Sequence, residues 1–169
     1  MPWLPWAKQE PVDLQSMVDR LRLFRGKFDL GLDYVFGIFD RSGDRLLGST
    51  GLHTRPGGNA REIGYWISTS HVNKGYATEA VSALIKIGFD IENLDRIEIH
   101  CDPENHKSRR IPERLGFTHE ATLKNRFVDA LDQLRDKMIW TMFKDQYEKT
   151  AIKSMPVKAF DIIGREIEY

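Results

Sequence analysis

The chain has 169 residues, of which 41% are hydrophobic and 30% charged, with 25 Lys and Arg against 25 Asp and Glu. This length suits one domain, and the balanced charge excludes a general nucleic-acid binder that relies on a basic surface. No apolar run approaches the roughly 18 residues that span a bilayer, so no membrane partner is predicted. Cys101 is the only cysteine and the five histidines show no paired spacing, which excludes an internal disulfide, argues against a metal site and fits a cytoplasmic protein.

Hydrophobic spacing in the first half of the chain predicts a helix, a three-stranded antiparallel meander and a second helix. The helices fall at 12–28 and 76–93, and the strands at 34–39, 46–53 and 61–67, with turns at 41–44 and 55–59.

The second half reads as three more strands around a short helix, followed by an extended tail. The strands are expected at 96–101, 118–125 and 136–143, the helix at 108–115 before Gly116, a turn at 128–133 and the tail at 157–169 with a bend near Gly164. A strand–helix–strand unit among antiparallel strands predicts an α+β fold with a mixed, mostly antiparallel sheet flanked by helices. Residues 1–169 should form a single domain, with strands 61–67 and 96–101 parallel through a right-handed crossover.

The start of the helix at residue 76 has the composition of an anion site. Gly75 allows close approach of a ligand to the backbone, and the small side chain of Ala77 adds little bulk. The free amides of a helix start and its dipole favour phosphate groups, so the amides from Asn73 to Thr78 could converge on a pyrophosphate. The alternative is an ordinary helix start with Asn73 as the N-cap and nothing bound.

A second polar segment follows about thirty residues later. Asn105 can hydrogen-bond a ligand amide, and Lys107, Arg109 and Arg110 form a basic cluster that fits a phosphate better than a nucleic-acid strand, because no aromatic residues are interleaved with it. The alternative is a solvated helix start.

These segments together resemble the Gcn5-related N-acetyltransferase superfamily, with its landmarks in the family's order. The resemblance is greatest to the branch that acetylates the N-termini of ribosomal proteins (RimJ/RimL-like), which also includes small-amine acetyltransferases. The matching segments are 4–7, 47–52, 62–67, 73–80, 105–117 and 159–161, with an acetyl-CoA-binding core at about 46–126.

The resemblance implies that acetyl-CoA is the cosubstrate and a primary amine the acceptor. Its pantetheine arm would pair with the backbone of Trp66, Ile67 and Ser68, and Asn105 would hold the pantetheine end. The pyrophosphate would lie on the amides of the following residues: Asn73, Lys74, Gly75, Tyr76, Ala77 and Thr78. Val72 departs from the family, which usually has Gln or Arg there, and we expect weaker binding as a result.

Direct attack of the amine on the thioester needs a base, oxyanion stabilisation and an acid for the departing thiolate. Many family members use a tyrosine as the acid, but that position is Pro112 here, and the branch pattern points to Ser108 instead. The resemblance also places Ser108 among the residues that bind acetyl-CoA. Ser108 could alternatively be a helix N-cap. Glu62 is the first candidate base and His53 the second, with water alone as a third alternative. Glu62 could instead be a surface strand carboxylate or a salt-bridge partner. Cys101 is interpreted as structural.

Members of this branch normally begin with a strand and a helix that this sequence lacks before residue 4. We expect the resulting free sheet edge to be covered by the 157–169 tail or by a partner chain. The predicted activity is acetylation of a protein or peptide N-terminus. A small-amine acetyltransferase acting on a polyamine, amino acid or antibiotic, a weakly active acetyl-CoA-binding scaffold, and a homodimer remain open alternatives.

Overall fold

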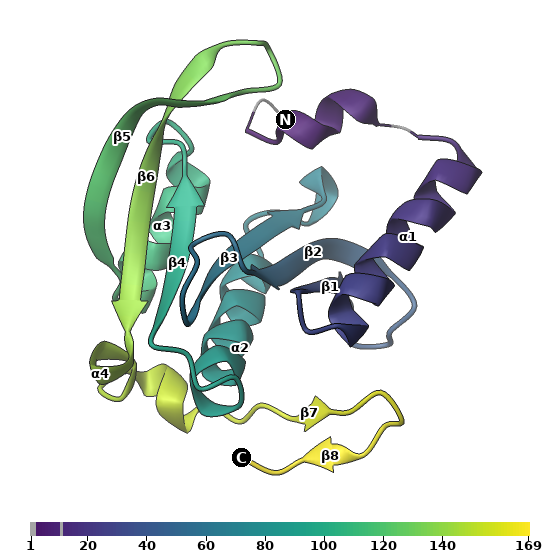
Figure 1. The fold of residues 1–169 in the computed structure, drawn as a ribbon, viewed down its shortest axis with the longest axis vertical. Helices are drawn as coiled ribbons and strands as arrows, with labels where there is room; N and C mark the ends of the chain where they lie inside the picture. Colours follow the sequence, from purple (N-terminus) through teal and green to yellow (C-terminus); the bar gives the residue numbers. More distant parts are fainter. Residues whose placement is uncertain (1–2, 11) are drawn as a thin grey trace.

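The computed structural model describes residues 3–10 and 12–169. Figure 1 shows its helices and strands along the chain. The first half contains η1 (Pro5–Gln9), α1 (Leu14–Asp29), β1 (Asp33–Phe39), β2 (Leu46–His53), β3 (Ala60–Ile67), η2 (Thr69–His71) and α2 (Tyr76–Asp90), where η denotes a 3-10 helix. The second half contains β4 (Arg96–Cys101), α3 (His106–Leu115), β5 (Thr118–Val128), β6 (Leu134–Phe143), α4 (Lys144–Tyr147), η3 (Ala151–Ser154), β7 (Ala159–Phe160) and β8 (Glu166–Ile167). Within the described residues, no helix has the length and apolar character needed to cross a membrane.

Six strands form one mixed sheet in the order β1-β2-β3-β4-β6-β5. Four neighbouring pairs are antiparallel, and β3 and β4 are parallel, with α2 connecting them. This arrangement confirms the predicted α+β class, the mostly antiparallel sheet and the parallel crossover.

Local hydrogen bonds explain why several elements begin or end a few residues from their predicted bounds. The Oδ1 atom of Asn105 accepts from the backbone N–H of Ser108 at 3.2 Å, so α3 begins at His106 rather than at Ser108. In the β5–β6 turn, the carboxylate of Asp129 accepts from the amides of Leu131 and Gln133 at 2.7 and 3.0 Å. This tight turn lets both strands extend beyond the predicted 118–125 and 136–143.

The core lies between the sheet and the helices α2 and α3, which cover one of its faces (Figure 1). Its buried side chains come from strands and helices alike, and burial of each large one stabilises the fold by about 1.5–3 kcal/mol. They include Leu52, Ile63, Val81, Ile85, Phe89, Ile97, Ile99 and Ile111. Because side chains alternate across a strand, Glu62 and Glu98 project from the opposite face, hereafter the open face.

Helix α1 packs on the edge strand β1 through aromatic contacts. The ring of Phe28 lies 5.0 Å from that of Tyr34 and 5.5 Å from that of Phe36, both nearly edge-on. At the other end, the carboxylate of Asp13 caps the helix by accepting from the amide of Ser16 at 3.0 Å. None of the side chains of α1 is fully buried.

The C-terminal tail does not pair with an edge of the six-stranded sheet, which corrects the first of the two alternatives for the free edge. The partner-chain alternative stays a prediction. β7 and β8 pair with each other in a separate two-stranded sheet, through Ala159–Ile167 and Phe160–Glu166 (Figure 1). The expected bend at Gly164 is present, with a positive φ of 81°. The tail bonds to itself because this short turn brings its two halves together in register.

Candidate active site

The parallel pairing of β3 and β4 is short and ends inside both strands. It comprises three residue pairs, from Ala60–Arg96 to Glu62–Glu98, whereas β3 runs on to Ile67 and β4 to Cys101. The C-terminal half of β3 therefore has no strand partner on the side of β4. We call residues 63–67 of β3 the unpaired edge.

One predicted ligand-binding residue presents its backbone to this unpaired edge. The amide of Ser68 donates to the carbonyl of Leu47 at 2.8 Å, which makes Gly48–Ile67 a pair without hydrogen bonds between its own members. The N–H and C=O of Ile67 consequently point away from β2, toward the unpaired edge. Peptide groups alternate along a strand, so those of Trp66 and Ser68 face β2.

The side chain of Trp66 lies on the open face, where it contacts the N-terminal segment. The rings of Trp66 and Trp6 are 5.8 Å apart and tilted by 58°. η1 therefore lies beside the C-terminal end of β3. An aromatic pair therefore lies at this end of the strand.

The start of α2 is built by two residues with positive φ. Gly75 is the N-cap with φ 87°, and Asn73 has φ 63°, so Asn73 is not the N-cap that the alternative interpretation assumed. The amide of Glu79 donates to the carbonyl of Gly75 at 3.0 Å, which is the first bond of the helix. The three amides before it, those of Tyr76, Ala77 and Thr78, have no acceptor within the helix. Such amides can bind an anion.

Ser108 lies opposite the unpaired edge, and its partner is a residue that the sequence analysis missed. The hydroxyl of Tyr65, on β3, is 2.9 Å from the Oγ of Ser108 and donates to the Ser108 carbonyl at 3.1 Å. Ser108 is the third residue of α3 and not its N-cap, so the capping alternative is wrong. The side-chain oxygen of Asn105 is already engaged in capping, which leaves its amide group for a ligand.

Burial raises the pKa of two further titratable groups near Ser108, the phenol of Tyr65 and the thiol of Cys101. It raises the pKa of Tyr65 well above its ordinary value, despite the opposing hydrogen bond with Ser108. It also raises the pKa of Cys101 to about 11. Both groups therefore stay protonated at neutral pH, and a buried neutral thiol agrees with a structural role for Cys101.

Glu62 lies on the open face in a chain of charged side chains. It is 8% exposed, its Oε1 accepts from Arg55 at 2.8 Å, and its Oε2 lies 3.3 Å from the Nδ1 of His100. The Nε2 of His100 lies 2.7 Å from Glu98, whose other oxygen accepts from Arg96 at 2.9 Å. Glu62 is therefore a buried carboxylate that forms an ion pair, as the salt-bridge alternative predicted, and it is not an exposed surface group. Its role as the base stays a prediction.

His53, the second candidate base, is held by a different carboxylate. Its Nδ1 lies 2.6 Å from Asp33 of β1, and it is paired with Glu62 in the strand register. This places both candidate bases side by side on the open face.

The basic cluster of α3 is only partly available to a ligand. The guanidinium of Arg109 donates to Glu113 at 2.7 Å, whereas the side chains of Lys107 and Arg110 are exposed. Phosphate contacts from this helix would come from the two exposed cations.

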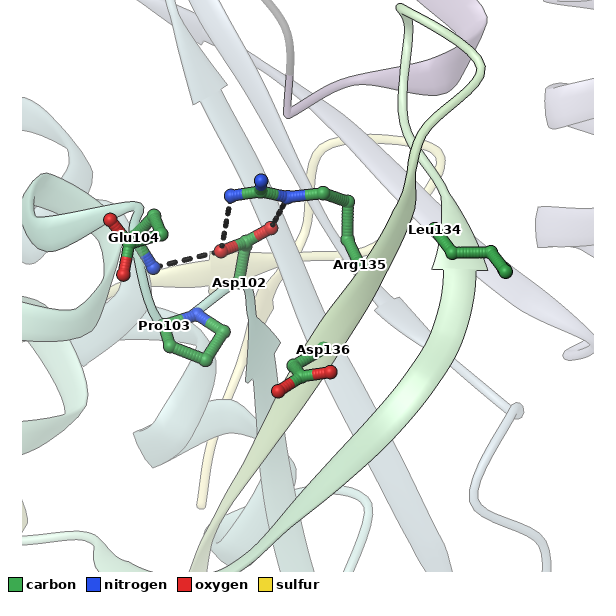
Figure 2. A pocket seen from close by; sticks show the side chains of 6 residues that line it. All are labelled: Asp102, Pro103, Glu104, Leu134, Arg135 and Asp136. Carbon is green, nitrogen blue, oxygen red and sulfur yellow. Dashed lines mark hydrogen bonds and ion pairs between the residues drawn. The ribbon is translucent and has the colours of Figure 1, made fainter.

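A polar pocket lies between the loop that follows β4 and the start of β6 (Figure 2). It is lined by Asp102, Pro103, Glu104, Leu134, Arg135 and Asp136. Arg135 donates to both oxygens of Asp102, at 2.7 and 3.2 Å, and so ties β6 to the loop before α3. This ion pair fixes the loop that carries Asn105.

A mixed sheet whose central parallel pair separates in front of a helix start is the architecture of the acyl-CoA N-acyltransferase fold. The chain belongs to the acetyltransferase (GNAT) domain family, whose sequence profile matches residues 1–118. The predicted absence of a first strand and helix stays a prediction.

Individual relatives agree with this assignment. The ribosomal-protein-serine acetyltransferase of Escherichia coli is 32% identical over 126 residues, which are 72% of this chain and 69% of that protein. The structure of Mycobacterium smegmatis RimJ with CoA-disulfide has a TM-score of 0.77 at 24% identity, covering 89% of this chain and 73% of the other. Spermidine N-acetyltransferase from Vibrio cholerae, with CoA and spermine, has a TM-score of 0.70 at 22% identity and covers 84% and 82%. At these identities the two structures show a shared fold.

Coverage of the first curated relatives is incomplete. The chain spans 63%, 52% and 57% of the lengths of three N-acetyltransferases that it matches at 35–36% identity.

Proposed function

We propose that the protein transfers an acetyl group from acetyl-CoA to a primary amine, most readily a protein or peptide N-terminus, by direct attack in a ternary complex. The observation that carries this proposal is the early end of the β3–β4 pairing, which leaves the backbone of Ile67 unpaired beside a helix start with free amides. A pantetheine arm has amide groups that can pair with a strand edge, and a pyrophosphate suits helix amides.

Binding follows from these two backbone features. The amide groups of the pantetheine pair with Ile67, Asn105 holds the end of this arm, and the pyrophosphate binds the amides that lead into α2. Lys107 and Arg110 contact the nucleotide phosphates. The thioester then lies between the open face and Ser108.

Chemistry on this arrangement is divided between the two faces of β3. On the open face, Glu62 takes the proton of the attacking amine through a water molecule. The amine nitrogen forms a bond to the thioester carbon, and the carbon–sulfur bond breaks. On the helical face, Ser108 gives its hydroxyl proton to the departing sulfur, and Tyr65 orients that hydroxyl.

The charges on the open face favour a peptide terminus over a polyamine. Each buried glutamate of the chain is paired with an arginine, Glu62 with Arg55 and Glu98 with Arg96. The pairs leave little negative field to attract a polycation. An α-amine of pKa about 8 is also more easily deprotonated than an amine of pKa about 10.4.

Calorimetric titration with acetyl-CoA, followed by thiol release with a panel of N-terminal peptides, spermidine and amino acids, tests the proposal. We expect binding and release that depends on the acceptor, fastest with peptides. Faster release with spermidine would support the small-amine alternative, and binding without any release would support a scaffold. Failure to bind acetyl-CoA would contradict the proposed function.

A further inference from the structure

The open face carries five charged or titratable side chains in one continuous row. The order is Arg55, Glu62, His100, Glu98 and Arg96, with successive contacts of 2.8, 3.3, 2.7 and 2.9 Å. The two glutamates are each 8% exposed and the imidazole is half-buried. Nothing in the proposed mechanism uses His100, Glu98 or Arg96.

The two contacts of the His100 ring differ in length. Because an ionised carboxylate only accepts hydrogen bonds, the shorter contact, 2.7 Å from Glu98 to Nε2, favours the tautomer with its proton on Nε2, and we assign that tautomer. In the neutral imidazole, Nδ1 is then an acceptor, and it faces the Oε2 of Glu62. These two acceptor atoms, Oε2 of Glu62 and Nδ1 of His100, lie 3.3 Å apart, so a proton on Glu62 can pass to the imidazole.

We propose that His100, held by Glu98, is a positioning residue that receives from Glu62 the proton taken from the acceptor amine. This inference rests on the proposed function. The amine proton passes to Oε2 of Glu62 and then to Nδ1 of His100, which becomes an imidazolium between two carboxylates. It returns to solvent after product release, and Ser108 recovers its proton from solvent, so protons balance over the cycle.

Arg55 explains why the proton moves on from Glu62. Its guanidinium donates to the other oxygen of that carboxylate at 2.8 Å and forms an ion pair with it. A proton held on Glu62 would weaken this ion pair, whereas an imidazolium at His100 gains a carboxylate at each nitrogen. The relay requires a neutral His100 before the amine is deprotonated, so protons on both ring nitrogens of the ligand-free protein would overturn the inference.

Other groups around His100 do not compete for this proton. Ile139 of β6 is its register partner, and the hydroxyl of Thr141, opposite Glu98, donates to Glu120. His53, beside Glu62, is engaged with Asp33. In the described part of the chain, no three His, Cys, Asp or Glu side chains are placed to hold a metal ion, so the row is not a ligand set.

Nitrogen-15 NMR of the ligand-free protein tests the proton assignment without turnover. The shifts of the His100 ring should place the proton on Nε2 in the wild type, and Glu98→Ala should give a mixture of tautomers. A proton on Nδ1 would overturn the inference even if the protein transfers acetyl groups. The same holds if the nitrogen-15 shifts of His100 are unchanged in Glu98→Ala. Urea unfolding of each variant verifies that its fold is retained.

Kinetics then test the proton transfer itself. His100→Gln should lower kcat about 10²-fold with an unchanged KM for acetyl-CoA, and should remove the limb of the kcat–pH profile at the lower pH. Added imidazole should restore much of the rate to His100→Ala, which a merely structural role would not allow. His119→Gln, at an exposed histidine of β5, is the matched control and should keep the wild-type rate. A His100→Gln enzyme with wild-type kcat and pH profile would overturn the inference and leave the proposed function standing. A wild type that transfers no acetyl group would refute the proposed function, and of the inference only the proton assignment at His100 would then remain.

Discussion

The hydroxyl of Tyr65 lies 2.9 Å from the Oγ of Ser108, and so joins β3 to α3 across the unpaired edge. The hydroxyl of Tyr65 also donates to the carbonyl of Ser108 at 3.1 Å, and either hydroxyl can be the donor between the two side chains. Burial raises the pKa of Tyr65, which keeps this chain of hydroxyls neutral. The serine proton can then be replaced only through a neutral neighbour or solvent.

Substitution of this pair should separate the acid from the residue that orients it. Ser108→Ala should lower kcat about 10²-fold, the lower end of the range for a lost general acid. Tyr65→Phe removes one hydrogen bond of about 1 kcal/mol and should lower kcat roughly fivefold. Thiol release measures both rates, and calorimetry should show unchanged acetyl-CoA affinity. Ser154→Ala, at an exposed serine of η3, is the control. A Ser108→Ala enzyme with wild-type kcat would remove Ser108 from the proton path.

Two glycines with open surroundings should respond oppositely to alanine. Nothing lies within 4 Å of a Cβ added at Gly75 or Gly26, so neither substitution creates a clash. At Gly75 the backbone has a positive φ of 87°, so Gly75→Ala should lower the free energy of unfolding by about 1 kcal/mol. The same substitution should weaken acetyl-CoA binding. At Gly26, inside α1, alanine should raise the free energy of unfolding by about 0.5–1 kcal/mol and leave acetyl-CoA binding unchanged. Urea unfolding and calorimetry measure both effects, and equal affinities in the two variants would contradict the proposed pyrophosphate site.

Elements with strong periodicity were predictable because their own side chains specify them. Arg96–Cys101 was predicted to the residue, since apolar residues alternate with charged ones throughout the strand. The start of α3 was missed because it depends on the side chain of Asn105, which binds an amide three residues away. The tail hairpin was missed because its pairing is decided by two-residue strands too short to carry a pattern.

At the candidate site, motif residues were predictable, but their partners were not. Ser108, Glu62 and the helix start at Gly75 follow from the family resemblance. Tyr65 was missed because its role depends on a contact 43 residues away. His100 had one usable signal: it lies two residues after Glu98 on a strand, and such residues share a face. Its contact with Glu62, on the neighbouring parallel strand, required the register of β3 and β4.

The Arg135–Asp102 pair should contribute more to stability than an exposed pair of the same geometry. The side chain of Asp102 is 2% exposed, and that of Arg135 is 25% exposed. Arg135→Ala leaves a buried carboxylate without its cation and should lower the free energy of unfolding by about 2 kcal/mol, less than a fully buried pair would give. Arg165→Ala is a matched control, because its Nε also lies 2.7 Å from an aspartate, Asp161, but its side chain is 76% exposed. That variant should lose at most about 0.5 kcal/mol in urea unfolding. Equal losses of the free energy of unfolding in the two variants would show that burial of Asp102 does not strengthen its ion pair with Arg135.

Asp90 should make the stability of the protein depend on pH in the acid range. Burial alone raises the pKa of this carboxyl, but hydrogen bonds from Lys86, Tyr147 and Lys153, at 2.9, 2.7 and 3.0 Å, outweigh it and lower the pKa. A lowered folded-state pKa means that the unfolded state binds the proton first. The stabilisation is therefore complete above the unfolded value of about 3.9 and is lost as the pH falls through the folded value.

Removal of this carboxylate should flatten the acid limb of the stability curve. Asp90→Asn should lower the free energy of unfolding at neutral pH, because the cations of Lys86 and Lys153 lose their shared partner. The difference in free energy of unfolding between this variant and the wild type should become smaller below about pH 4. Asp145→Asn is the control, since its side chain is 75% exposed and its contact with Lys149 is 3.6 Å, so it should follow the wild-type curve. Urea unfolding between about pH 3 and pH 7 measures the three curves. A constant gap between Asp90→Asn and the wild type across this range would show that the link from α2 to α4 and η3 does not depend on the charge of Asp90.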